Sequence, residues 1–108
     1  MEQHISEADW KLFRQLRTSA LERFCQRVLS EVVRVASGEV TSSHERYLEV
    51  YRLIQEQDEE LASAFNDSRR STARWQLAQI RSLGLLTDEE YAKFSAETRD
   101  AVEVLTRG

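Results

Sequence analysis

The chain contains no proline and only three glycines among its 108 residues. Because proline and glycine interrupt helices, their scarcity leaves long stretches in which a helix can continue. Together with the many Glu, Arg, Leu and Ala residues, this predicts an all-α protein with few, short loops. The length suits one domain, so we expect a single helical domain over residues 1–108.

A long first helix is predicted from Ser6, a good N-cap, to Gly38, a natural stop. Between them, apolar residues recur every three or four positions, as on the buried face of a helix. These residues are Trp10, Phe13, Leu16, Ala20, Phe24, Val28, Val32 and Val35. The helix would have roughly 30 residues, which is long for a globular protein, and Thr18-Ser19 marks a candidate bend.

The apolar band of this first helix drifts and widens along its length, near Arg14, Arg17 and Glu31. Two interpretations stay open. Either the two ends of the helix touch different neighbours in the same molecule, or one end projects and docks on a partner.

The segment GEVTSS should form the next turn, and Ser42 with Glu45 makes a capping-box pattern for a second helix. Its expected inner face has apolar residues in alternating steps of four and three, with one acid among them. The residues of that stripe are Tyr47, Tyr51, Ile54, Asp58, Leu61 and Phe65.

A third helix is expected from Asp67 or Ser68 to Leu83, with Gly84 as its stop. Thr87 with Glu90 forms a second capping box, and Ser95 looks like a further cap, so the last segment should divide into a short turn and a final helix. The predicted inner residues of the third helix are Ala73, Leu77, Ile80 and Leu83. The whole pattern predicts a four-helix bundle-like or orthogonal helical domain with a long first helix.

Asp58 is the one acid in the predicted inner stripe of the second helix. A buried carboxylate without a partner costs several kcal/mol or becomes protonated. Arg74, about as far after the turn as Asp58 is before it, is the first candidate partner, and Arg70 is the second. We therefore expect a structural ion pair; a ligand-binding or catalytic role for Asp58 is the alternative.

Trp75 falls outside the inner stripe of the third helix, nearly opposite Leu77. Ala78, Ser71 and Ser82 share its side. An indole among small residues is typical of protein interfaces, so Trp75, Ala78, Ser71 and Ser82 are a candidate interface. The alternative is that the first helix covers Trp75 within the same molecule.

A run of arginines on the third helix, made up of Arg69, Arg70, Arg74 and Arg81, forms a candidate basic patch. It suggests a nucleic-acid-binding regulator as the main alternative function. The net charge of −4 and the acids at Asp88, Glu89 and Glu90 speak against that alternative.

Catalytic and metal-binding patterns are not apparent in the sequence. His4 and His44 have no second ligand at a recognised spacing, and neither has a local orienting partner, so no Cys/His/acid or Ser/His/acid set is indicated. We therefore expect no metal, no cofactor and no catalytic residue, although an enzyme of unknown reaction stays an alternative.

The single Cys25 cannot form a disulfide within the chain, which favours a reducing, cytoplasmic location. Residues 1–30 lack the pattern of a signal peptide, and no apolar stretch reaches the roughly 18 residues of a membrane-spanning helix. The sequence is thus best interpreted as a non-enzymatic protein-interaction or regulatory domain that binds a protein partner or forms a homodimer.

Overall fold

The computed structural model describes residues 5–107, and all regular structure in this range is helical. The elements are α1 (Glu7–Ala36), α2 (Ser43–Phe65), the 3-10 helix η1 (Arg70–Thr72), α3 (Ala73–Ser82), α4 (Asp88–Ala92) and α5 (Ala96–Arg107). The predicted all-α class and the long first helix are confirmed. α1 continues through Thr18 and Ser19 as one helix.

The predicted helix starts lie where the capping residues place them. The Oγ atom of Ser6 accepts from the amide of Asp9 at 3.2 Å, and that of Ser42 accepts from the amide of Glu45 at 3.1 Å. Thr87 and Glu90 form a complete capping box. Local hydrogen bonding by these side chains therefore fixes where α1, α2 and α4 begin.

The predicted start of the third helix is wrong by several residues. Asp67 has a φ of 58°, and Arg70–Thr72 form a turn of 3-10 helix, so α3 begins only at Ala73. A left-handed residue cannot continue an α-helix, and Asp tolerates that conformation better than most residues.

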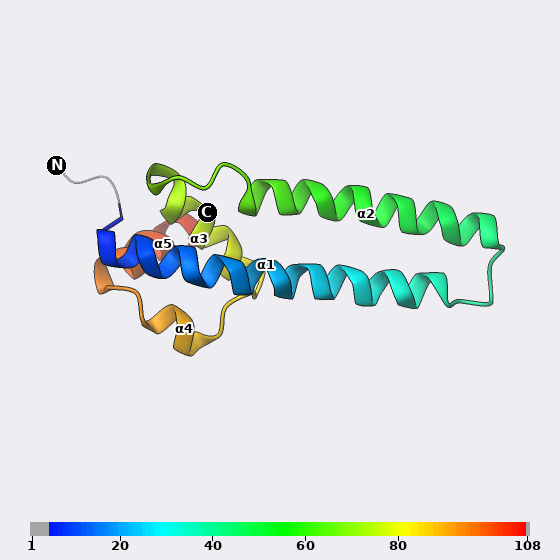
Figure 1. The fold of residues 1–108 in the computed structure, drawn as a ribbon, viewed down its shortest axis with the longest axis horizontal. Helices are drawn as coiled ribbons and strands as arrows, with labels where there is room; N and C mark the ends of the chain where they lie inside the picture. Colours follow the sequence, from blue (N-terminus) through cyan, green and yellow to red (C-terminus); the bar gives the residue numbers. More distant parts are fainter. Residues whose placement is uncertain (1–4, 108) are drawn as a thin grey trace.

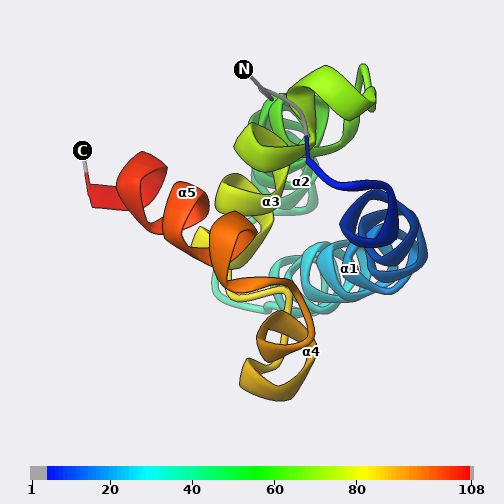
Figure 2. The same ribbon diagram turned by 90° about the vertical axis from the view of Figure 1, so that its left-hand side faces the viewer.

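The molecule is elongated, with extents of 58 × 23 × 23 Å (Figure 1). α1 and α2 form a long antiparallel hairpin, and α3, α4 and α5 gather at one end of it. Figure 2, viewed from that end, shows α4 next to α1 and α5 next to α3. We call this end the head, and we call residues 25–63 of the hairpin the arm.

The hydrophobic core of the described chain lies entirely in the head. It includes the first half of α1, the last turn of α2, and α3 to α5. The buried apolar residues are Ile5, Phe13, Ala20, Phe24, Ala64, Phe65, Ala73, Leu77, Ala78, Ile80, Leu85, Tyr91, Phe94 and Val102.

Asp9 joins the two ends of the described chain inside the head. Its carboxylate, only 5% exposed, accepts from the hydroxyls of Ser95 and Thr98, both at 2.6 Å, and from the amide of Ser95 at 3.2 Å. Burial alone would raise the pKa of Asp9, but these hydrogen bonds outweigh it and hold the pKa below its ordinary value. A residue of α1 thus supports the start of α5.

Two arginines of α1 hold the turn between α3 and α4. Arg23 donates to both carboxylate oxygens of Glu90, at 2.7 and 3.0 Å, and to the carbonyl of Leu85 at 2.8 Å. Arg27 donates to the carbonyls of Leu83 and Gly84, each at 2.6 Å. The hydrogen bonds from Arg23 are the largest cause that lowers the pKa of Glu90, from 4.5 to about 2.

Candidate interaction surface on the helical arm

The arm has no core of its own. No residue between 25 and 63 is buried, although these positions include many large apolar side chains. Isolated helices are only marginally stable, and helices in proteins obtain most of their stability from tertiary packing of an apolar face. In Figure 1 most of the arm extends beyond the head as two antiparallel helices.

On α1, the exposed apolar side chains lie on the flank turned away from the head. Arg23 and Arg27 contact the α3–α4 turn and its neighbours, so they mark the side of α1 that faces the head. Cys25 follows Arg23 by two positions and Leu29 follows Arg27 by two positions, which places both about 200° around the helix from that side. Leu29 and Val33 are more than half exposed. The α1 flank away from the head is therefore apolar and uncovered.

On α2, the exposed apolar residues are Tyr47, Tyr51 and Ile54. Together with Leu29 and Val33 they are between 48% and 67% exposed. The expectation that the stripe from Tyr47 to Asp58 faces inward is thus wrong. Among the partly covered side chains of α2, those of Leu53, Gln57 and Leu61 share hollows with residues of α1.

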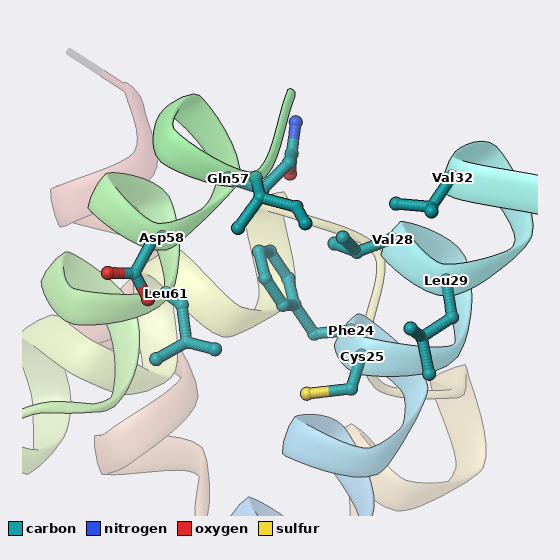
Figure 3. Close-up of a pocket in the computed structure, with 9 residues that line it drawn as sticks. Phe24, Cys25, Val28, Leu29, Val32, Gln57, Asp58 and Leu61 are labelled. Atoms are coloured by element: carbon teal, nitrogen blue, oxygen red, sulfur yellow. The ribbon is translucent and has the colours of Figure 1, made fainter. Parts of the chain in front are cut away.

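The two exposed flanks meet in one open groove between α1 and α2 (Figure 3). Its volume is about 330 Å³. It is lined by Phe24, Cys25, Val28, Leu29, Val32, Ile54, Gln57, Asp58 and Leu61. Figure 3 shows Phe24 between the helices, with Leu61 on the α2 side and Cys25 on the α1 side. We call the groove with its rim residues Val33, Tyr47 and Tyr51 the arm face.

Asp58 belongs to this face rather than to an internal ion pair. It is exposed, and it is the only charged residue among those that line the groove. Arg74 contacts Glu97 at 3.5 Å, and Nε of Arg70 donates to the carbonyl of Ile5 at 3.0 Å. The expected pairing of Asp58 with Arg74 or Arg70 is therefore wrong, because both arginines face the N-terminal end and α5 instead of the arm.

The Trp75 surface is present in part. Trp75 is 53% exposed, so α1 does not cover it. It shares a hollow of about 280 Å³ with Ala78, Ser82 and Leu105. Ala78 is buried at its base, and Ser71 lies outside the hollow, on η1. Its use as an interface stays a prediction.

The predicted basic patch is not one free surface. Arg69 contacts Asp67 at 2.7 Å, and Arg81 lies over the ring of Tyr91, 4.0 Å from its centroid, with Glu103 at 3.8 Å. Arg70 and Arg74 have the contacts described above. Four arginines that already have acids, carbonyls or a ring as neighbours are poorly placed to bind phosphates together.

The described residues contain neither a metal-binding cluster nor a membrane-spanning helix. Within residues 5–107 no group of three or more His, Cys, Asp or Glu side chains is placed to hold a metal ion. His44 is exposed at the start of α2, and His4 lies outside the described residues. No helix of the described chain is long and apolar enough to cross a bilayer.

The sequence contains a signal for the arm face that periodicity alone did not resolve. Apolar residues of α1 between 25 and 36 cover both the seam toward α2 and the flank beside it. Such width indicates contacts with more than one neighbouring helix. The open interpretation in which one end of α1 projects agrees with the structure; docking on a partner is taken up below.

Comparison of the chain with protein-family models, with curated proteins and with solved structures found no match in any of the three.

Proposed function

We propose that this protein is a non-enzymatic interaction domain that binds another protein chain through the arm face. One observation carries the proposal: from residue 25 to residue 63 no side chain is buried, although the arm has a continuous apolar flank. Hydrophobic burial is the main favourable term in folding and association, so such a flank gains stability when a partner covers it.

The size and chemistry of the arm face suit a protein partner. The five most exposed residues of the arm face are each 48% to 67% exposed. With side chains of roughly 150–250 Å², they leave on the order of 500 Å² of apolar surface uncovered, near the upper limit for a monomer's largest apolar patch. Tyrosine is enriched at interfaces, and the arm face has two of them, Tyr47 and Tyr51. The groove is open and lined mainly by apolar side chains, as helix-binding grooves are.

The head has a different role in this proposal. Its core contains Phe24 of α1 together with Ala64 and Phe65 of α2, so it joins both helices at the base of the hairpin. The head therefore presents the arm, and the arm provides the contact surface.

Site-specific photo-crosslinking in cells that make the protein tests this function. A photoreactive phenylalanine analogue at Tyr51 should yield a protein adduct in high amount. The same analogue at Lys93, an exposed position of the head, is the control and should give at least about 10-fold less adduct. Equal labelling at both positions, or no protein adduct at Tyr51, would refute an interaction through the arm.

A further inference from the structure

Building on the proposed function, we infer that the chain covering the arm face is a second copy of this protein, packed antiparallel. Two arms would then form a four-helix bundle in which each helix has two antiparallel neighbours. The inference goes beyond protein binding in general, since it names the occupant, its direction and the residues that meet.

The arm supplies half of such a bundle. A two-stranded seam requires a narrow apolar stripe, whereas a helix in a four-helix bundle contacts two neighbours and has a wider one. On α1, Val28 shares a hollow with Leu53 and Gln57 of α2, while Leu29 and Val33 are exposed beside it. The width of the stripe thus corresponds to one neighbour that is present and one that is absent.

The exposed stripe of α2 has a spacing that matches itself in reverse. Its positions are Tyr47, Tyr51, Ile54 and Asp58, in steps of four, three and four. An antiparallel copy that places Tyr51 opposite the partner's Ile54 therefore also places Tyr47 opposite the partner's Asp58. A twofold axis at the midpoint between Tyr51 and Ile54 produces both pairs twice, as an isologous interface requires.

The exposed flank of α1 has the same reversible spacing. Cys25, Leu29, Val32 and Ala36, along the edge of the groove, also follow in steps of four, three and four; Leu29 and Ala36 are exposed, and Cys25 and Val32 are partly covered. The same axis would pair Leu29 with the partner's Val32 and Cys25 with the partner's Ala36. Since Leu29, Val32 and Ile54 line one groove, the midpoints on α1 and α2 lie at a similar height along the arm.

This arrangement explains the acid in the apolar stripe. Covering Asp58 with an apolar surface would be costly, because a desolvated carboxylate needs a donor. The partner's Tyr47 brings a hydroxyl group to that position, and a phenol can donate to a carboxylate. The pair would also favour one register over sliding, as single polar groups do in helical bundles.

Charge and space permit two copies to meet. Asp58 is the only acid in the groove and no Lys, Arg or His lines it, so the two faces would carry little like charge toward each other despite the net charge of −4. The head lies on the opposite flank of α1, next to Arg23 and Arg27, so two heads would point outward at opposite ends. Each copy would cover its apolar flank and the polar rim, approaching the roughly 800 Å² per partner of a standard interface.

Oxidative crosslinking of the full chain tests the register directly, using the native thiol. In the proposed dimer Cys25 lies beside the partner's Ala36, so Ala36→Cys should give a covalent dimer of twice 12.6 kDa under mild oxidation. Within one chain the two positions are about 16 Å apart along the helix, which excludes an internal disulfide. Ser30→Cys, exposed and about 120° around α1 from Ala36, is the control and should crosslink at least ~10-fold more slowly.

The outcomes separate this inference from the proposed function. Rapid crosslinking of Ala36→Cys with a slow wild type supports the antiparallel dimer. Rapid crosslinking of wild-type Cys25 to itself would indicate parallel arms and overturn it. A chain that sediments as a monomer at every concentration would also overturn it, while a Tyr51 photo-adduct with a different protein would leave the proposed function standing.

Discussion

Replacing Asp9 with alanine is expected to lower the free energy of unfolding by about 3 kcal/mol, a large effect for a single polar side chain. The change removes a buried carboxylate that accepts from Ser95 and Thr98 and leaves their hydroxyls and the amide of Ser95, just before α5, without that acceptor. Urea unfolding followed by circular dichroism measures the loss. Asp9→Asn, which keeps one acceptor oxygen, should lose less.

The same carboxylate should make stability depend on acid. Because hydrogen bonds lower the pKa of Asp9 in the folded state, its contribution is complete above its unfolded pKa and disappears as the pH falls through the lower folded value. Glu90, with a pKa of about 2 in place of 4.5, acts in the same direction. Asp9→Ala should therefore show a shallower loss of stability below about pH 4.5 than the wild type. Equal slopes, or a loss under about 0.5 kcal/mol at neutral pH, would contradict the anchor role.

Two glutamates placed on the arm face should abolish association. We expect Leu29→Glu combined with Ile54→Glu to weaken binding at least about 100-fold, because charges forced into an apolar interface cost several kcal/mol. Sedimentation equilibrium measures the effect for self-association, and the yield of the Tyr51 photo-adduct measures it for any other protein partner.

A matched variant controls for added negative charge. Ser19→Glu combined with Ser30→Glu adds the same charge to exposed positions of α1 away from the arm face. This control should associate as the wild type does. Both double variants should keep head stability within about 0.5 kcal/mol of wild type, because all four positions are exposed. Equal loss of association in the two variants would refute the assignment to this face.

Local chemistry made most of the secondary structure predictable. The caps at Ser6, Ser42 and Thr87 satisfy amides within three residues, so sequence spacing alone identifies them. The stripe of α1 through Phe13, Ala20 and Phe24 was also assigned correctly, since it belongs to the head core.

The orientation of α2 was not predictable in the same way. Its apolar residues occupy two neighbouring arcs, one with Val50 and Leu53 and one with Tyr47 and Tyr51. Periodicity reports that both arcs are apolar, and it cannot tell which one faces α1. A helix that is apolar on both arcs can pack against the other helix of its hairpin with one arc and against an additional helix with the other.

Tertiary contacts between distant residues were missed for a different reason. Asp9 is in the first turn of α1, where an acid is favourable for any helix, yet it also accepts from Ser95 and Thr98, far away in the sequence. Similarly, Arg74 contacts Glu97 rather than Asp58 because α5 packs on α3. No pattern within one helix specifies which distant element will lie against it.

Hydrogen exchange of the wild-type protein over a range of concentrations tests the central claim, that the arm lacks a core and obtains one from a partner. At high dilution, amides of residues 25–63 should exchange much faster than those of α3, since local opening is easiest where nothing is buried. As the protein associates, protection should rise at least ~10-fold in both arm helices and little in the head. The account is wrong if the arm amides are as protected as those of α3 at every dilution and if their protection does not change with concentration or in the crosslinked Ala36→Cys dimer. The arm would then be stable alone.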